Sequence, residues 1–171
     1  MLIVVDYQVD FVDGVFGPVP DAIAIEDAVD QRIAACRERD EPVLFTMDTH
    51  AAAGYEDTRE GGLFGLHCVE GTEGWNLYGK VRAHQAGATL IRKRAFGSLD
   101  LVAHVRALPT PAQITLVGVS TNICVLSNAI LLLSAFPETR TVVDSAACAA
   151  FTRADHDAAL RQLAGLGASI V

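Results

Sequence analysis

The stretch ITLVGVSTNICV, residues 114–125, combines a strand, a turn and the start of a helix. Residues 114–117 form a short apolar run that Gly118 ends, which is typical of a strand buried on both faces. Thr121 or Asn122 can then cap a helix that continues through an apolar block to about Ala135. A buried strand that leads directly into a helix is the repeating unit of a parallel sheet, so this stretch indicates an α/β fold.

Short apolar runs and amphipathic segments alternate over the rest of the chain. Asp21 can cap a helix to about Asp40, Ser98 can cap another, and residues 152–155 (TRAD) are a capping-box pattern. Residues 48–88 are rich in glycine and show little periodicity, so we expect an irregular segment there. We predict a three-layer, Rossmann-like α/β fold with about six parallel strands in the order 3-2-1-4-5-6 and helices on both faces. The expected strands are residues 2–5, 43–46, 89–91, 114–117, 141–143 and 168–171.

Length, charge and cysteine content limit the classes of protein that this chain can represent. Its 171 residues contain no repeat or Pro/Gly/Ser-rich linker, so we expect a single domain over residues 1–171. The net charge of −8 argues against nucleic acid or an anionic membrane as a partner. The apolar runs are far shorter than the roughly 20 residues that span a bilayer, and we see no signal peptide. The 4 cysteines lack a CxxC pair and do not form a disulfide framework, so we expect a cytoplasmic protein.

Polar residues follow the carboxyl ends of three expected strands. Asp6 follows the first strand, Lys93 follows the third, and Cys124 lies in the first helical turn after the fourth. Ligands of open parallel sheets bind beyond these strand ends, so the three side chains are expected to converge. The helix-start amides would stabilise a thiolate and could bind an oxyanion, while Asp6 takes the thiol proton and Lys93 holds both anions. Each residue also has a plainer interpretation: a small buried apolar side chain for Cys124, a loop-capping carboxylate for Asp6, and a solvated basic run for Lys93.

A candidate metal site follows the second expected strand. Asp48 and His50 come directly after it, and His67 lies on a glycine-rich loop farther along. Two imidazoles and a carboxylate suit a divalent metal, Zn²⁺ first and Fe²⁺ or Mn²⁺ as alternatives. Glu60 lies between the two histidines and is a further candidate ligand. The other histidines are interpreted as surface residues: His84, His104 and His156. Cys36 and Cys148 are interpreted as packing residues, and the role of Cys68 stays open.

The order Asp6, Lys93, Cys124 along the chain, with Asp48, His50 and His67 between the first two, resembles the nicotinamidase/pyrazinamidase branch of the isochorismatase-like cysteine hydrolases. The resemblance covers nearly the whole chain. Residues 4–11, VVDYQVDF, are similar to the first strand and D-x-Q-x-D-F segment of that family. Residues 67–72, HCVEGT, and 118–125, GVSTNICV, are similar to its H-C-V-x-G-T segment and its nucleophile loop. The chain departs from the branch where Trp-Pro, D-W-H-P and an aromatic residue are common: at Leu63-Phe64-Gly65-Leu66, Asp48-Thr49-His50-Ala51 and Ile123. These departures alter the expected pocket wall and leave the expected catalytic set intact.

The resemblance implies a reaction. Asp6 would deprotonate Cys124, and the thiolate would attack a carboxamide carbonyl to form a thioester that water hydrolyses after ammonia has left. Lys93 would orient the pair. The backbone amides of Ser120 and Cys124 would form the oxyanion hole, and the peptide bond between Val119 and Ser120 is expected to be cis.

The resemblance also implies how a substrate is placed. The metal at Asp48, His50 and His67 would bind the pyridine nitrogen of nicotinamide, and Phe11 and Phe64 would form aromatic walls. The habit of the family is to form dimers or larger assemblies, so we expect a homo-oligomer.

The leading hypothesis is therefore a cysteine amidohydrolase that converts nicotinamide to nicotinate and ammonia. A second enzyme hypothesis is hydrolysis of an N-carbamoyl, ureido or other small amide, and isochorismate hydrolysis ranks below both. A hypothesis of another class is a catalytically silent interaction protein on the same fold. A dinucleotide oxidoreductase ranks last, because no G-x-G-x-x-G follows the first strand.

Overall fold

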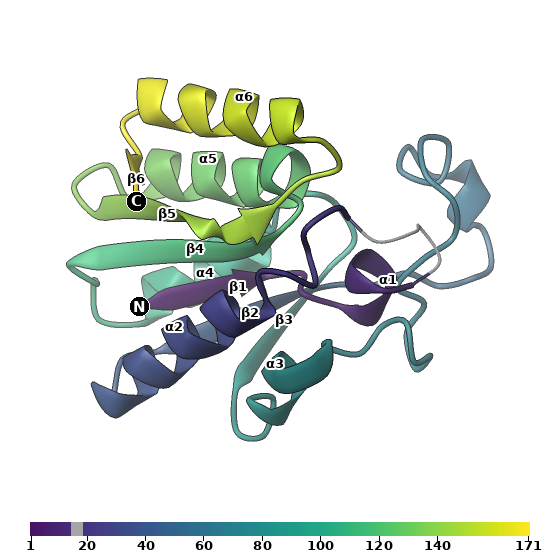
Figure 1. Ribbon diagram of the computed structural model, residues 1–171, viewed down its shortest axis with the longest axis horizontal. Coiled ribbons are helices and arrows are strands. Elements are labelled where there is room, and N and C mark those ends of the chain that lie inside the picture. The colour runs from purple at the N-terminus through teal and green to yellow at the C-terminus, as the bar shows by residue number, and fades with distance from the viewer. Residues whose placement is uncertain (15–18) are drawn as a thin grey trace.

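A sheet of six parallel strands organises the fold (Figure 1). The computed structural model describes residues 1–14 and 19–171 and orders the strands β3-β2-β1-β4-β5-β6. All neighbouring strands pair in parallel. The predicted α/β fold with strand order 3-2-1-4-5-6 is confirmed. The strands are β1 (Leu2–Val5), β2 (Val43–Asp48), β3 (Thr89–Lys93), β4 (Gln113–Val119), β5 (Arg140–Ala149) and β6 (Ser169–Ile170).

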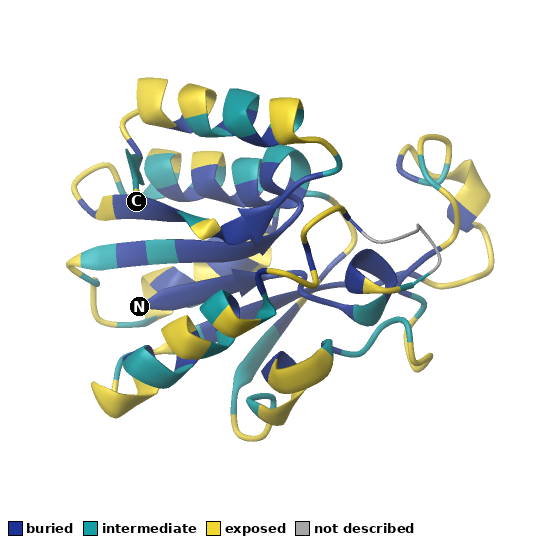
Figure 2. Cartoon of the chain, in the orientation of Figure 1, coloured by how far each residue is buried: buried dark blue, intermediate teal, exposed yellow. Residues whose placement is uncertain are grey.

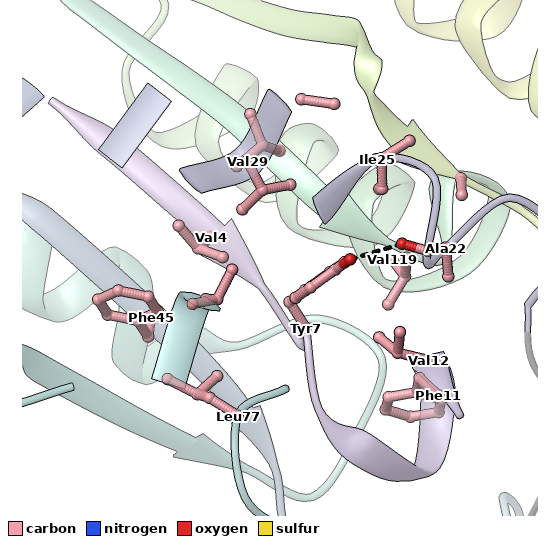
Figure 3. Packing of buried hydrophobic residues seen from close by; sticks show 14 of the residues in the cluster. Val4, Tyr7, Phe11, Val12, Ala22, Ile25, Val29, Phe45, Leu77 and Val119 are labelled. Carbon is pink, nitrogen blue, oxygen red and sulfur yellow. Dashed lines mark hydrogen bonds between the residues drawn. The ribbon is translucent and has the colours of Figure 1, made fainter. Parts of the chain in front are cut away.

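Helices cover both faces of this sheet, because the strand side chains alternate between two apolar clusters. Leu2 and Val4 of β1 pack into one cluster with α2 (Glu26–Glu38) and α3 (Gly79–Ala83), part of which Figure 3 shows. Ile3 and Val5 pack into the other with α4 (Leu99–Ala107), α5 (Leu126–Ala135) and α6 (Arg153–Gly165). The helices are therefore buried on one side and exposed on the other, while the strands are buried on both (Figure 2).

Several boundaries differ from the sequence prediction. The prediction that Asp21 caps a helix is wrong, because α2 begins at Glu26 and Asp21 adopts a positive φ of 67° in the turn before it. That turn is fixed by the core: the buried Tyr7 hydroxyl donates a 2.5 Å hydrogen bond to the Ala22 carbonyl (Figure 3). Ser98 and Thr152 cap α4 and α6 as expected, each side chain accepting a backbone amide hydrogen bond.

Three short helical segments lie where no helix was expected. They are α1 (Val9–Val12), η1 (Tyr55–Asp57) and α3, the last two within the segment predicted to be irregular. Strand β5 is also longer than the predicted residues 141–143, because buried apolar residues 147–149 continue it beyond Asp144 and Ser145. Its pairing with β4 shifts register between Leu116 and Gly118, and β4 then leads into the turn that carries Cys124.

Gly118 is expected to tolerate no side chain. Its φ is 113°, and a Cβ atom there would lie 2.1 Å from the Val5 carbonyl oxygen on β1. We expect Gly118→Ala to lower the free energy of unfolding by about 3 kcal/mol or more, measured by urea denaturation. Gly165→Ala is the matched control: a Cβ there meets nothing within 4 Å, and alanine at this last residue of α6 should change the free energy of unfolding by less than about 1 kcal/mol. Equal stabilities of the two variants would contradict the prediction.

No helix within residues 1–14 and 19–171 is long and apolar enough to cross a membrane.

The outer face of α5 bears on the prediction of a homo-oligomer. Ile130 on α5 is 40% exposed, which leaves a large apolar side chain on the outer side of this helix. The homo-oligomer stays a prediction.

Candidate active site

The carboxyl ends of β1, β3 and β4 bring the three expected reactive groups together. Lys93 Nζ lies 2.8 Å from an oxygen of Asp6 and 3.6 Å from Cys124 Sγ. All three side chains are buried, with Asp6 at 0%, Lys93 at 4% and Cys124 at 5% exposed. Thr46 on β2 fixes the carboxylate by donating a 2.7 Å hydrogen bond to its other oxygen. The structure thus places a carboxylate, an ammonium and a thiol in contact at one edge of the sheet.

Burial dominates the electrostatics of these groups. Burial raises the pKa of the Cys124 thiol well above its ordinary value; the Lys93 ammonium opposes this shift and the Asp6 carboxylate adds to it. Burial likewise raises the pKa of Asp6 against the attraction of Lys93. Burial would lower the pKa of Lys93, but Asp6 and Cys124 outweigh it and raise that pKa. Lys93 therefore stays charged, and the two acidic groups beside it favour holding one proton between them.

The turn that carries Cys124 is a π-helical turn, η2 (Thr121–Val125), directly after β4. The peptide bond between Val119 and Ser120 is cis, at the position that the resemblance implies. Neither expected cap forms: Ser120 Oγ donates to Asn122 Oδ1 over 2.8 Å, and Thr121 Oγ1 lies 2.9 Å from His156 Nδ1. The interpretation of His156 as a surface residue is wrong, because α6 packs on η2 and buries it.

A second cluster lies beside the first and shares Asp48 with it. Asp48 Oδ1 accepts a 3.0 Å hydrogen bond from Lys93, while Oδ2 lies 3.2 Å from Nε2 of both His50 and His67. Glu60 Oε1 lies 3.8 Å from His50 Nε2 and 3.6 Å from His67 Nε2. One donor atom from each of these four buried residues falls within 4.8 Å of the others. The structure therefore brings together all the predicted metal ligands, Glu60 included.

The chemistry of this donor set fits a divalent cation. His67 Nδ1 lies 2.7 Å from the Gly65 carbonyl oxygen, which keeps a proton on Nδ1 and leaves Nε2 to face Asp48. Burial lowers the pKa of His67, but hydrogen bonds to Asp48 and Glu60 outweigh it and raise that pKa to about 9. Burial opposes the ionised form of Asp48, yet Lys93 and both imidazoles hold the pKa of this carboxyl far below its ordinary value. Two buried carboxylates thus attract positive charge between the histidines, as a metal site requires.

Two residues that the sequence analysis left without a role support this cluster. Gln8 pairs with the backbone of Asp48, donating to its carbonyl over 2.9 Å and accepting from its amide over 2.7 Å. Asp10 accepts a 2.7 Å hydrogen bond from the backbone amide of Cys68, next to His67. Both lie in the D-x-Q-x-D-F segment, which was the available signal. Cys68 is fully buried and held by this contact, which favours a structural role.

A narrow cavity of about 20 Å³ lies beside Cys124 and the histidine cluster. Phe11 and Phe64 line it, as the resemblance implies, and so do Phe96 and Phe151, which the sequence analysis missed. Phe96 follows β3 and Phe151 follows β5. Since ligands of parallel sheets bind beyond the carboxyl ends of the strands, both could have been predicted from their positions. The remaining lining residues are Glu60, His67, Ser120, Ile123 and Cys124. The four phenylalanine rings make most of this wall apolar, so a ligand that reaches Cys124 would pass between aromatic rings.

Comparison with known proteins identifies the family of the chain. Residues 1–171 match the family model of the isochorismatase domain. The chain belongs to the isochorismatase family. This family member is 31% identical to the uncharacterized isochorismatase family protein PncA of Bacillus subtilis (strain 168) over 184 residues, covering 99% of this chain and 97% of the relative. The predicted resemblance is confirmed.

Solved structures of isochorismatase-family hydrolases share its architecture. The crystal structure of nicotinamidase/pyrazinamidase PncA from Bacillus subtilis aligns with a TM-score of 0.88 at 28% identity, covering 99% of this chain and 97% of that one. The pyrazinamidase of Pyrococcus horikoshii in complex with zinc aligns with a TM-score of 0.83 at 27% identity, again covering 99% and 97%. This isochorismatase-family hydrolase therefore has a buried cluster that resembles a pyrazinamidase metal site and could bind metal.

Proposed function

We propose that this hydrolase is a cysteine amidase that cleaves small heteroaromatic carboxamides, with nicotinamide as the leading substrate. The observation that carries the proposal is the contact of Lys93 with both Asp6 and Cys124 on the floor of an aromatic cavity. A thiol, a proton acceptor and a fixed cation in van der Waals contact are the parts that nucleophilic acyl transfer needs. The similarity to nicotinamidase and pyrazinamidase structures supports the same reaction class.

In the first half of the proposed reaction, Asp6 takes the proton of the Cys124 thiol. The sulfur forms a bond to the carboxamide carbon, and the carbonyl electron pair moves onto its oxygen. The backbone amides of Ser120 and Cys124 would hold that oxyanion. Asp6 then gives its proton to the amide nitrogen, the carbon–nitrogen bond breaks, and ammonia leaves behind a thioester.

In the second half, Asp6 acts as the base again. It takes a proton from water, whose oxygen attacks the thioester carbon. The carbon–sulfur bond breaks, the carboxylic acid leaves, and Cys124 recovers its proton from Asp6. Lys93 keeps its charge throughout, so it stabilises whichever of the two acidic groups carries the negative charge.

The residues that would hold the cofactor are Asp48, His50, Glu60 and His67. A divalent metal bound there, zinc as the first choice, would supply a Lewis acid that accepts a ring nitrogen of the substrate. His67 both belongs to this cluster and lines the cavity, so a substrate between the two sites would be held at its ring and attacked at its carboxamide.

The lining of the cavity favours a neutral substrate. Among the described residues, no arginine or lysine side chain lines it, and Lys93 beneath the floor already pairs with Asp6 and Asp48. Isochorismate or an N-carbamoyl amino acid would bring a carboxylate into this space, where the Glu60 carboxylate already lies in the wall and no arginine or lysine side chain faces it. A neutral aromatic amide needs no such partner and can stack between phenylalanine rings.

An ammonia-release assay tests the proposal. Zinc-loaded protein is incubated with nicotinamide, pyrazinamide, an N-carbamoyl amino acid and a simple aliphatic amide. We expect the two heteroaromatic amides to be cleaved with the highest kcat/KM. Preferential cleavage of the carbamoyl compound would replace the proposed substrate class, and no ammonia from any substrate would favour the silent interaction protein.

Zinc is expected to raise the Tm of chelator-treated protein. A ligand at about 100 times its Kd that binds only the folded state adds about 2.7 kcal/mol, which is about 5–10 °C for a chain of this size. His67→Ala should lose most of this shift in differential scanning fluorimetry. His104→Ala, on α4 and outside the cluster, is the matched control and should keep it. An equal shift in both variants would show that zinc binds elsewhere.

A further inference from the structure

Asn128 on α5 is a fully buried polar residue, exposed at 0%, that the proposed reaction does not use. Its amide group donates a 2.8 Å hydrogen bond to the Cys124 carbonyl and a 3.1 Å hydrogen bond to the Phe96 carbonyl. Its oxygen accepts a 2.9 Å hydrogen bond from the backbone amide of Ser98. One side chain therefore ties the helix of the nucleophile to two points on the loop that follows β3.

Both ends of this connection lie at the cavity. Phe96 lines the cavity and packs edge to face on Phe64, with ring centroids 6.1 Å apart. Cys124 also lines the cavity, and two hydrogen bonds from the Asn128 amide group connect its carbonyl to that of Phe96. The segment between them is held closely, because a Cβ on Gly97 would lie 2.8 Å from Leu131 on α5. The backbone of Phe96 is thus fixed relative to the attacking sulfur by one amide side chain.

We propose that Asn128 is a positioning residue that sets the separation of Phe96 and Cys124 across the substrate cavity and thereby controls whether a planar ring can enter. The inference deepens the proposed function and rests on it for the identity of the ring. The hydrogen bond to Phe96 is what holds the wall back. Without it, the Phe96 ring relaxes into the apolar cavity beside it, because exposed aromatic surface and empty space are both unfavourable.

This role differs from support of the helix alone. A hydroxyl at the same position could bond only to the carbonyl one turn earlier, as Ser134 Oγ already does to Ile130 in α5 over 2.8 Å. Asn128→Ser would therefore keep a bond to Cys124 and lose the two bonds to Phe96 and Ser98. Asn128→Ala loses all three. The pair of variants separates the effect on the cavity wall from the effect on the nucleophile.

Alkylation of Cys124 tests the inference without assuming any substrate. The rate is measured by peptide mass spectrometry for iodoacetamide, which is small, and for 2-iodo-N-phenylacetamide, which carries a ring. We expect both Asn128 variants to lower the ratio of the aromatic rate to the small-reagent rate by about tenfold, the size of a modest pocket change. The iodoacetamide rate of Asn128→Ser should stay close to that of wild type. Ser127→Ala, the preceding position on α5, is the matched control and should leave the ratio unchanged.

The outcomes separate this inference from the proposed function. A ratio within about twofold of wild type in folded Asn128→Ser protein overturns the role of Asn128, as does an equal fall in both rates. If wild type cleaves nicotinamide, Asn128→Ser should also raise KM by about tenfold with kcat nearly unchanged. If wild type releases no ammonia from any amide, the proposed function fails, and the alkylation ratio still decides the role of Asn128.

Discussion

Cys124→Ala is expected to lower kcat for nicotinamide by about 10⁴-fold or more, because removal of a nucleophile leaves only binding and the oxyanion site. Cys124→Ser should be nearly as inactive. Its hydroxyl is a far weaker acid than the thiol, and the buried site already raises the pKa of the group at this position. The measurement is ammonia release with zinc-loaded protein at saturating substrate.

Cys36→Ala is the control for the loss of a buried thiol. Cys36 packs in α2 on the opposite face of the sheet from Cys124, so this variant should keep kcat within about twofold while losing about 1 kcal/mol of stability. Acid quenching of wild type during turnover should trap the acyl group on Cys124, detected as an added mass on that peptide. A Cys124→Ala protein that keeps a tenth of the wild-type rate would remove Cys124 from the reaction.

The positions of Asp6, Lys93 and Cys124 could be predicted because they depend on one topological fact. Parallel strands all end at the same edge of their sheet, so a polar residue after each strand reaches that edge whatever lies between them in sequence. The strands themselves were recognisable from continuous apolar runs, which packing on both faces requires. Asp48 follows the same rule, and it joins the two clusters because β2 lies between β1 and β3.

Residues that act through distant backbone groups could not be found in this way. Gln8 bonds to Asp48 40 positions away, and Asp10 bonds to Cys68 58 positions away. The segment between β2 and β3 has little internal periodicity, since side chains from elsewhere in the chain hold it in place. His67 was therefore predicted from its residue type, its glycine-rich loop and the family resemblance of residues 67–72, and not from a strand end.

His156 illustrates the same limit on a regular element. Its helix, α6, was predicted correctly. Which side of α6 meets η2 depends on how the two elements pack against each other on one face of the sheet. The bond to Thr121 also explains why the expected cap is absent: the hydroxyl that would cap the turn is engaged by another helix. The tertiary contact with His156 therefore replaces the local capping hydrogen bond that the residue type of Thr121 favours.

Lys93→Met is expected to lower the free energy of unfolding by about 3–5 kcal/mol, because it leaves two buried carboxylates without their shared cation. Lys93 Nζ lies 2.8 Å from Asp6 and 3.0 Å from Asp48, and all three side chains are buried. The measurement is urea denaturation at a fixed zinc concentration. Lys80→Met is the matched control: its ammonium pairs with Asp27 at the surface, where an ion pair contributes about 0–1 kcal/mol.

A double-variant cycle with Asp6→Asn shows whether that cost comes from the carboxylate. Asparagine keeps the shape of Asp6 and its contact with Thr46 but removes the charge that Lys93 compensates. If the two groups are coupled, the double variant should be more stable than the sum of the single changes predicts, by about 1–3 kcal/mol. Additive losses would mean that Lys93 stabilises the fold through Asp48 instead. In either case Lys93→Met should release ammonia at least about 10²-fold more slowly, since no fixed cation remains beside the thiolate.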